Sequence, residues 1–235
     1  MAFSVLRFRL LPVLLGAVCC VMGGGSSAKA QADAGNAPQT RLNRLASHFD
    51  LAVSGVGDFE TSVSGRVQNN ISPTAQNLSQ KQFRAVAGVM GTIRGQRSPW
   101  VGGEFNYRWA RYSYTFDFTD PALNFFTQNT ANEFTLGYVA HPDHPLLGLK
   151  PFVGAGAGTV EFKPSRNSGS GLPVQARAAY YYTLGGDKPI VNDTFGLRVG
   201  FRQVFYLAPD FGQNYLLIKQ RAISSEPFLG LYVHF

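Results

Sequence analysis

Apolar and polar residues alternate one by one along several stretches of the chain. This period of two is typical of β-strands whose two faces meet different environments. The clearest stretch has Phe49, Leu51, Val53 and Phe59 on one face and Asp50, Ser54 and Asp58 on the other. Further stretches with the same period cover about 83–93, 100–116, 133–138, 150–162, 175–184, 195–205 and the last residues up to 235. The pattern therefore predicts eight strands.

The connections between these stretches alternate between long and short. Long connections rich in Asn, Gln, Ser, Asp and Pro lie at 60–80, 117–131, 164–174 and 208–222. Shorter connections with turn residues lie at 95–98, 142–149 and 185–193. This alternation is the arrangement of transmembrane barrels with an even number of strands. We therefore expect the strands to run up and down through a membrane.

The lengths of the strands agree with a membrane setting. Ten residues rise about 33 Å along a strand, which a tilt near 40° projects to roughly 25 Å, the height of the apolar band of such barrels. No stretch after Met22 approaches 18 apolar residues, which excludes helical spans. Strands in lipid must pair every backbone group, so they close on themselves. The prediction is an all-β fold, an eight-stranded antiparallel up-and-down transmembrane β-barrel over residues 47–235.

The carboxyl end carries a short motif. Gly230-Leu231-Tyr232-Val233-His234-Phe235 has a glycine, an apolar residue three positions later and a final phenylalanine. Together with the strands and loops above, this motif makes the chain resemble the small eight-stranded outer-membrane barrels of the type of the OmpA transmembrane domain and OmpX. The chain also resembles the broad class called outer-membrane protein β-barrel domain. The resemblance implies that Gly230, Val233 and Phe235 form an assembly signal for the barrel assembly machinery. It also implies that outer-membrane lipid surrounds the barrel and that the long loops face the cell exterior.

Residues 1–30 have the three parts of a secretory signal peptide. Arg7 and Arg9 precede an apolar run from Leu10 to Met22, and small residues lead to Ala28-Lys29-Ala30. The run of 13 residues is shorter than the roughly 20 that a spanning helix needs. We expect cleavage after Ala30, which leaves 31–46 as a flexible N-terminal periplasmic segment.

Removal of residues 1–30 changes the composition of the mature chain. It takes away Cys19, Cys20 and three of the 21 basic residues but none of the 14 acidic ones, so the net charge falls from +7 to +4. Without a thiol, disulfides, cysteine-bound metals and cysteine nucleophiles are excluded. No basic cluster remains to bind nucleic acid. Lipoprotein acylation at either cysteine is an alternative, although neither follows the usual Leu-Ala-Gly sequence.

Candidate catalytic, cofactor and metal sites all have a plainer structural interpretation. Gly154, Gly156 and Gly158 continue a period-two row instead of opening a helix, so they indicate a close-packed strand and not a nucleotide-binding loop. His141 and His144 flank Asp143 in a proline-rich segment, which we interpret as a periplasmic turn and not as a metal site. All four histidines, which also include His48 and His234, are expected at the periplasmic end, away from outer-leaflet lipid. The sequence therefore predicts no catalytic, cofactor or metal residues.

Charged residues on the polar face form the most informative set. In a barrel of eight strands this face points into a lumen that side chains fill, and buried charges must be paired or hydrated. We expect a lumen network with five arginines and three glutamates: Arg84, Glu104, Arg108, Glu133, Glu161, Arg177, Arg198 and Arg202. On the lipid face, we expect Tyr107, Trp109, Tyr112 and Tyr114 in an interfacial belt. Arg111 follows Phe105, Tyr107 and Trp109 on the same lipid-facing row and is expected to contact lipid phosphate groups.

The function expected from these patterns is that of a non-enzymatic barrel with a structural or surface-interaction role through its long loops. A small passive channel is the first alternative, although a filled lumen speaks against it. A lipid-modifying enzyme is a further alternative, but no base and nucleophile form a recognisable pair. A soluble lipocalin-like barrel is the last alternative, and it would turn its apolar face inward around a ligand.

Overall fold

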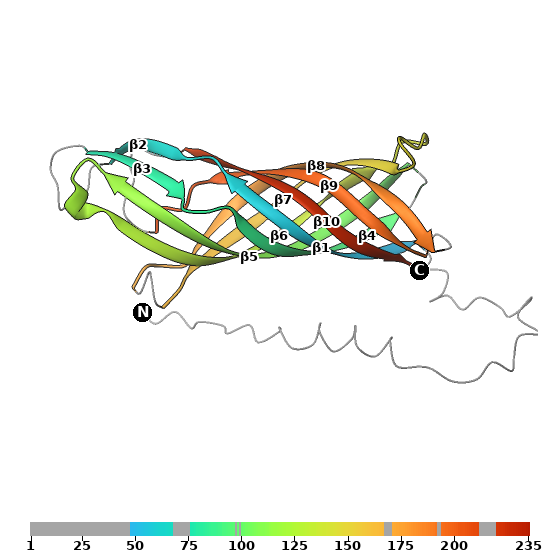
Figure 1. Cartoon of the computed structure of the whole chain (residues 1–235), viewed down its shortest axis with the longest axis horizontal. Coiled ribbons are helices and arrows are strands. Elements are labelled where there is room, and N and C mark those ends of the chain that lie inside the picture. The colour runs from blue at the N-terminus through green and yellow to red at the C-terminus, as the bar shows by residue number, and fades with distance from the viewer. Residues whose placement is uncertain are drawn as a thin grey trace, which may run out of the picture. The chain divides into compact units, whose positions relative to one another are not determined.

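A computed structural model describes residues 48–67, 76–96, 98, 100–166, 171–191, 194–211 and 220–235. The expected signal peptide (1–30) and N-terminal segment (31–46) lie outside these residues. The strands are β1 (Phe49–Glu60), β2 (Val63–Val67), β3 (Gln76–Gln82), β4 (Val86–Gln96), β5 (Val101–Phe118), β6 (Phe125–Ala140), β7 (Lys150–Pro164), β8 (Gln175–Val191), β9 (Phe195–Leu207) and β10 (Arg221–His234) (Figure 1). A single 3-10 turn covers Pro121–Leu123 among the described residues, and no helix in this part of the chain is long and apolar enough to cross a membrane.

Eight of the strands close into one antiparallel barrel. Their order is β5-β4-β1-β10-β9-β8-β7-β6, and β5 pairs with β6 to complete the circle. The predicted eight-stranded up-and-down barrel is therefore confirmed. The end that carries the short turns and the carboxyl terminus is called the turn end below, and the opposite end is called the loop end.

The strands extend further than the sequence pattern predicts. β2 and β3 form a hairpin inside the expected loop 60–80, and β3 pairs with the outer part of β5. Strands β5 and β6 also occupy most of the expected loop 117–131, and β8 runs through most of the expected turn 185–193. The outward residues of the loop-end segments are largely polar, whereas inward residues such as Val63, Leu78 and Phe116 are buried in the lumen.

The pairing register sets the width of the barrel. A path of paired residues that starts at Asp50 on β1 and crosses each neighbouring strand in turn returns to β1 ten residues further on, at Glu60. It passes through Arg94, Glu104, Gly137, Gly156, Tyr181, Val204 and Ser224. For a barrel of this register, strand spacing and rise give a tilt of about 40° and a radius of about 8 Å. Side chains from opposite walls can meet across such a lumen.

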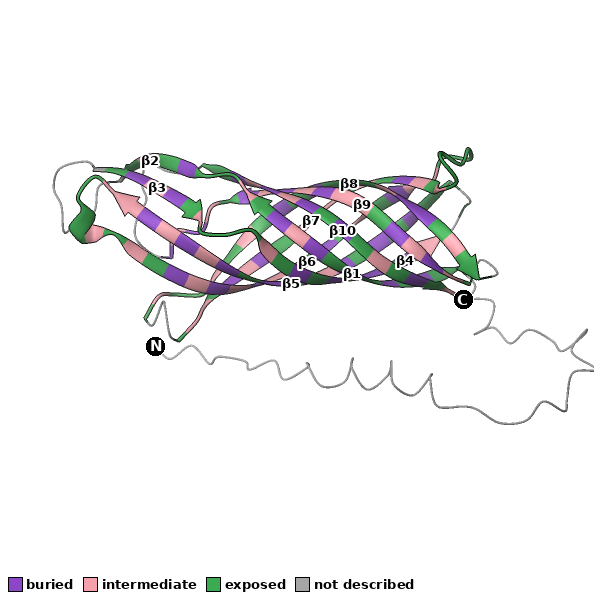
Figure 2. Cartoon of the chain, viewed as in Figure 1, coloured by how far each residue is buried: buried purple, intermediate pink, exposed green. Residues whose placement is uncertain are grey.

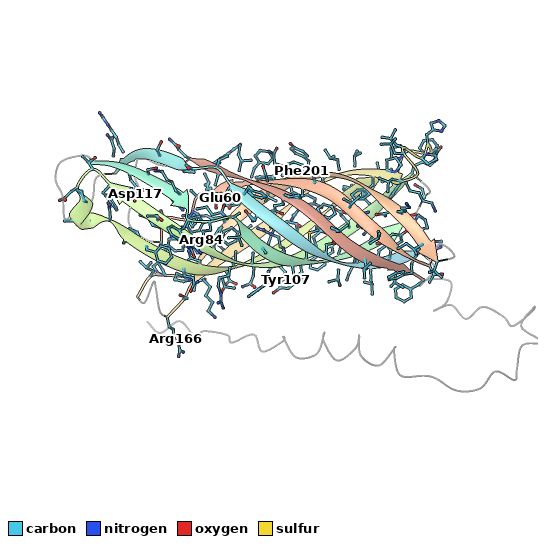
Figure 3. The ribbon with its side chains drawn as sticks, viewed as in Figure 1. Glu60, Arg84, Tyr107, Asp117, Arg166 and Phe201 are labelled. Atoms are coloured by element: carbon cyan, nitrogen blue, oxygen red, sulfur yellow. The ribbon has the colours of Figure 1, made fainter. Side chains whose placement is uncertain are left out.

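Buried and exposed residues alternate along most strands (Figure 2). Large apolar residues point outward, whereas charged and polar residues and, toward the loop end, aromatic rings point inward. On β1, the side chain of Val53 is 65% exposed, whereas those of its neighbours Ala52 and Ser54 are 4% and 1% exposed. Figure 3 shows Tyr107 and Phe201 on the outside of the wall. An apolar outer wall requires lipid around it. It also contradicts the lipocalin-like alternative, which needs the opposite orientation.

The lumen and lipid faces of strand β7 are exchanged relative to the prediction. The expected inward position of Glu161 would place Phe152 and Phe162 on the lipid face, but both are buried in the lumen, and the glycines between them also face inward. A methyl group at Gly156 would overlap the Leu136 carbonyl oxygen and would lie 2.7 Å from Cε1 of Tyr181. Gly156 therefore makes room for the ring of Tyr181. Both faces of β7 are small and apolar, so the sequence pattern left its orientation open.

Two of the four aromatic residues expected in the interfacial belt lie inside the barrel. Tyr107 and Trp109 point outward, whereas Tyr112 and Tyr114 occupy alternate positions of the same strand and are completely buried. Strict alternation along β5 places every even-numbered residue from Gly102 to Phe116 inward. The belt prediction is therefore wrong for Tyr112 and Tyr114.

Candidate functional site

The lumen of the barrel is filled by two layers of ion pairs and one layer of aromatic rings. The first ionic layer lies near the turn end and the second near the middle of the barrel. The aromatic layer fills the lumen toward the loop end. Each is built from side chains of several strands.

The turn-end layer joins two arginines to three carboxylates. Nε of Arg94 on β4 donates to Glu104 on β5 over 2.9 Å, and its Nη1 lies 3.7 Å from Asp187 on β8. Arg198 on β9 donates to both oxygens of Asp187 over 2.8 Å and lies 3.1 Å from Asp50 on β1. Strands from all sides of the barrel are therefore connected through this layer.

Aromatic rings complete the turn-end layer. The guanidinium of Arg94 stacks over the ring of Phe152 at 4.0 Å, and that of Arg198 lies 5.2 Å from the ring centre of Tyr232. Tyr181 donates its hydroxyl hydrogen to Glu104 over 2.8 Å. Cation–π contacts of desolvated arginines stabilise the charge that burial would otherwise disfavour. The inward-facing ring of Phe152 therefore stabilises the buried charge of Arg94.

The middle layer is organised around Arg108 on β5. Its Nε donates to Glu133 on β6 over 3.0 Å, its Nη1 donates to Asp58 on β1, and its Nη2 lies 3.2 Å from Glu226 on β10. Arg202 on β9 contacts the same two glutamates from the other side, with Glu226 at 3.3 Å. All five side chains are at most 2% exposed. Five charged side chains buried this close together are stable only when each is paired and hydrogen-bonded.

Each ionic layer contains one carboxylate more than it has arginines. Neutral hydroxyl groups donate the additional hydrogen bonds. Ser224 lies 2.9 Å from Asp58 and 3.0 Å from Glu226, and Tyr112 donates to Asp58. Hydrogen bonds to a carboxylate are stronger than those between neutral groups. The arginine excess expected from the sequence is therefore absent from these two layers.

The aromatic layer packs ring against ring. Tyr112 and Tyr114 are stacked with centroids 5.8 Å apart, and Phe162 lies 5.5 Å from Tyr206. Tyr114 donates its hydroxyl hydrogen to Glu60 over 2.6 Å. The other large buried rings of this cluster are Phe116 and Phe211. Together these rings occupy the lumen beyond the ionic layers, and none of them belongs to the expected lumen network.

The structure brings five of the eight expected lumen residues together and separates the other three. Glu104, Arg108, Glu133, Arg198 and Arg202 are buried in the two ionic layers. Arg84 lies in the bend between β3 and β4, is exposed and stacks over Phe83 at 5.2 Å. Glu161 is on the outward face of β7, because the lumen and lipid faces of that strand are exchanged relative to the prediction. Arg177 faces the loop-end mouth, where it pairs with Asp210 at 3.0 Å and stays partly exposed.

Five charged residues of the ionic layers were missing from the predicted network: Asp50, Asp58, Arg94, Asp187 and Glu226. The alternation in the sequence already placed Asp50 and Asp58 on the polar face of the first strand. Arg94 lay just beyond the expected end of its strand. Asp187 lay within an expected turn. Strand ends are the least certain part of any sequence pattern, and Arg94 and Asp187 lie at such ends.

The expected assembly and lipid-contact residues lie at the surface. Arg111 is exposed on the outward face of β5. Val233 and Phe235 are on the outward face at the turn end and are 37% and 50% exposed. Gly230 faces inward at the seam between β1 and β10, where a methyl group would overlap Ser54 and the Val53 carbonyl oxygen. This glycine thus has a packing reason of its own.

The four histidines lie at the turn end but form no cluster with other ligands. His48 and His234 border the seam between β1 and β10, and His141 and His144 follow β6. Among the described residues, no group of three histidine, cysteine, aspartate or glutamate side chains could hold a metal ion. Burial and the nearby positive charge of Arg94 lower the pKa of His141. This imidazole is therefore a structural group beneath the turn-end layer.

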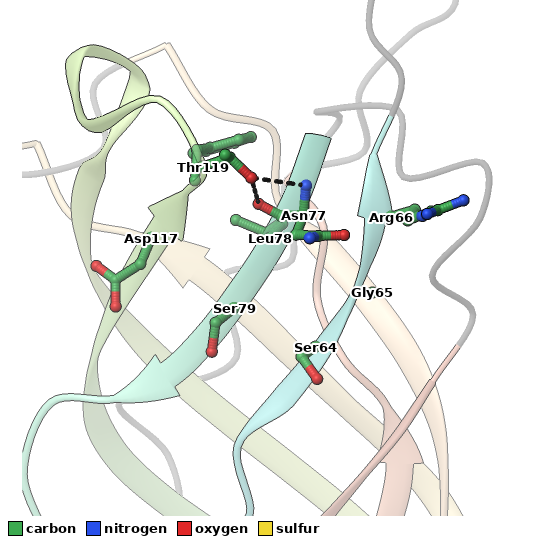
Figure 4. A pocket seen from close by; sticks show the side chains of 9 residues that line it. Ser64, Gly65, Arg66, Asn77, Leu78, Ser79, Asp117 and Thr119 are labelled. Atoms are coloured by element: carbon green, nitrogen blue, oxygen red, sulfur yellow. Dashed lines mark hydrogen bonds between the residues drawn. The ribbon is translucent and has the colours of Figure 1, made fainter. Parts of the chain in front are cut away.

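A shallow groove lies on the loop-end extension of the sheet (Figure 4). It has a volume of about 510 Å³ and runs between β2, β3 and the end of β5. The backbone N–H of Asn77 donates to Oγ1 of Thr119 over 3.1 Å, and Ser64 and Ser79 add hydroxyl groups to the lining. The groove is open, and its lining is mixed, because Leu78 and Phe118 lie in it beside the hydroxyl groups.

Comparisons by sequence match no protein-family model and no curated protein. By structure, the chain is similar to the outer membrane protein OprG from Pseudomonas aeruginosa, with 13% identity, a TM-score of 0.54 and coverage of 80% of this chain and 95% of OprG. It is also similar to the outer membrane protein AlkL, with 16% identity, a TM-score of 0.50 and coverage of 79% and 90%. Neisserial surface protein A shares 13% identity with a TM-score of 0.49 over 80% of this chain and 97% of that protein.

The fold of the chain is thus that of the small eight-stranded outer-membrane β-barrels, as the carboxyl-terminal motif suggested. This fold and the apolar outer wall place the protein in an outer membrane.

Proposed function

We propose that the protein is a closed, non-enzymatic outer-membrane barrel that acts through the part of its sheet outside the membrane, in a structural or surface-interaction role. The observation that carries this proposal is the change of the outward face along β5. From Val101 to Trp109 the outward residues are apolar or aromatic, apart from one glycine, whereas Arg111, Ser113, Thr115 and Asp117 follow on the same face. The strand therefore leaves the lipid about halfway along its length.

The dimensions of β5 support an exposed platform. Its 18 residues extend about 59 Å, which a tilt of about 40° projects to roughly 45 Å, compared with an apolar band of about 25 Å. About 20 Å of this strand thus extends past the lipid. Strand β6 accompanies it, and the hairpin of β2 and β3 widens the platform and carries the groove. A folded platform of this kind presents a fixed surface to an extracellular ligand.

The filled lumen supports the closed state. Two ionic layers and one aromatic layer cross the barrel, and the largest buried side chains are the arginines and aromatic rings of these layers. Opening a water path would separate buried ion pairs, which costs several kcal/mol for each charge. The small passive channel is therefore the weaker interpretation.

Two features support the partners proposed for this barrel. The outward row that ends with Val233 and Phe235 is available to the barrel assembly machinery, and the apolar wall fits outer-membrane lipid.

The proposal is tested by conductance and by surface labelling. Purified protein in a planar bilayer should show no steady openings, and a steady conductance would overturn the closed state in favour of the channel. Because the mature chain is expected to lack cysteine, single cysteines report position without background. Ser79→Cys on β3 should react with an impermeant maleimide on intact cells, whereas Leu136→Cys on the lipid-facing wall should not. Absence of labelling at Ser79→Cys, in cells whose lysate contains folded protein, would contradict the exposed platform.

A further inference from the structure

Two cations lie in one cross-strand row on the outer wall. Arg111 on β5 is paired with Thr130 on β6, and Thr130 is paired with Lys163 on β7. All three side chains point outward, and Arg111 and Lys163 are exposed. Among the described residues, neither cation has an ion pair or a hydrogen bond from its side chain. Two unpaired positive charges thus share one height of the wall.

The row lies where the wall changes from apolar to polar. On the membrane side, the rings of Tyr107 and Phe134 are in contact with centroids 5.0 Å apart, and Trp109 lies next to Arg111 on the same face. Aromatic residues of this kind mark the level of the lipid headgroups. The two cations therefore lie just outside the acyl chains, at the level of the phosphate groups of the outer leaflet.

Two strand spacings separate Arg111 from Lys163, which corresponds to about 10 Å between their Cα atoms. Both side chains are long and flexible enough to reach the space in front of Thr130 between them. We propose that Arg111 and Lys163 together bind a phosphate group of an outer-leaflet lipid, with the hydroxyl of Thr130 as a further donor. Guanidinium and ammonium groups form charge-assisted hydrogen bonds with phosphate oxygens.

The neighbouring charges set the strength of this site. Glu161 lies two residues before Lys163 on the same outward face and opposes an anion. Arg166, two residues beyond the end of β7, is exposed at the loop end and adds positive charge (Figure 3). Glu161 gives the site an internal control, because its neutralisation should strengthen phosphate binding, whereas neutralisation of either cation should weaken it.

The inference rests on the membrane location proposed above but not on the closed lumen. A barrel that does not conduct ions and does not bind phosphate would contradict the phosphate site but leave the proposed function intact. A conducting barrel that binds phosphate would leave the site intact.

The test uses the purified full barrel in nonionic detergent with EDTA, so that divalent cations cannot bridge Glu161 to the lipid. The probe is lipopolysaccharide whose lipid A carries its phosphates, compared with the same material after dephosphorylation. Trp109 lies beside the proposed site, and in a Trp100→Phe background its fluorescence reports binding. The Arg111→Gln, Lys163→Gln double variant should bind at least about tenfold more weakly, because it loses two charge-assisted hydrogen bonds. Glu161→Gln should bind more tightly.

Lys188→Gln is the matched control, since Lys188 is an exposed, outward cation at the turn end of β8. It should bind as the parent protein does. Dephosphorylated lipid should bind the parent no better than intact lipid binds the double variant. Equal affinity of the double variant and the parent, or of the two lipids, would overturn the proposal. Displacement of the lipid by inorganic phosphate at concentrations similar to those of the lipid would overturn the lipid as the occupant and assign the site to free phosphate.

Discussion

Arg108 on β5 and Glu133 on β6 are direct cross-strand partners, and Nε of the arginine lies 3.0 Å from Oε2 of the glutamate. The same guanidinium contacts Asp58 on β1 and Glu226 on β10. These two strands form the closing seam of the barrel. One arginine therefore ties both sides of the seam to the opposite wall.

Replacement of Arg108 by methionine should destabilise the barrel strongly. Arg108→Met keeps much of the side-chain volume but leaves Asp58, Glu133 and Glu226 with Arg202 as the remaining arginine of their layer. Removal of one partner from a buried ion pair costs about 3–5 kcal/mol. Guanidinium unfolding of the barrel in lipid vesicles, followed by tryptophan fluorescence, measures the change. Arg84→Met is the control, because Arg84 is exposed and should leave the midpoint nearly unchanged. Equal shifts for the two variants would contradict the layer described here.

Gly156 should not tolerate a side chain. In Gly156→Ala the new methyl group would press against the Leu136 carbonyl oxygen and the ring of Tyr181, and overpacking of this kind costs roughly 1–3 kcal/mol or more. At Gly91, on the outward face of β4, a methyl group meets no atom within 4 Å. Gly91→Ala should therefore fold as the parent does. Urea titration of both variants decides the orientation of β7, and a neutral Gly156→Ala would mean that β7 faces the other way.

Single changes within one layer should leave the lumen closed. Glu104→Ala disrupts the turn-end layer, yet the middle and aromatic layers still cross the barrel. Phe162→Ala removes a ring from the aromatic layer, yet both ionic layers remain. Neither variant should conduct steadily in planar bilayers at moderate salt, although both should unfold at lower denaturant concentration. A steady current from either one would show that a single layer forms the barrier.

The terminal phenylalanine should affect assembly more than the stability of the finished barrel. Phe235 is half exposed at the turn end, and its backbone N–H donates to the carbonyl oxygen of Phe49 across the seam over 3.3 Å. Phe49 has similar exposure at the same rim, so Phe49→Ala is a matched control. In cells, Phe235→Ala should reduce the heat-modifiable, folded form clearly more than Phe49→Ala. In detergent refolding of purified protein, the two variants should behave alike. Equal yields in cells would remove the argument for an assembly signal.

The number of barrel strands and the two faces of most of them could be read from the sequence, because lipid on one side and a packed lumen on the other enforce strict alternation. Strands such as β1 and β9 therefore show their faces directly. Strand β7 does not, because Gly156, between Phe152 and Phe162 on its inward side, makes room for the ring of Tyr181 and is as small as the residues on the outward side. The contact that decides its orientation lies on another strand, outside any local pattern.

The composition of the lumen layers was harder to predict for a related reason. A polar residue at a strand end, such as Arg94 or Asp187, resembles a turn residue until the pairing partner is known. Tyr112 and Tyr114 suit both a lipid interface and a buried lumen, since each has an apolar ring and a polar tip. Their position was settled by the register of β5, and their hydroxyl groups then found Asp58 and Glu60 as acceptors.

The pairing of Asp50 with His234 at the seam also bears on the timing of folding. These partners are separated by nearly the whole length of the barrel sequence, and contacts of such high sequence separation slow folding because a long loop must close before they form. Until β10 arrives, both β1 and β9 present unpaired edges that lipid cannot solvate. Insertion of the first strands alone is therefore unfavourable. We therefore expect the strands to insert together, once β10 can pair with both β1 and β9.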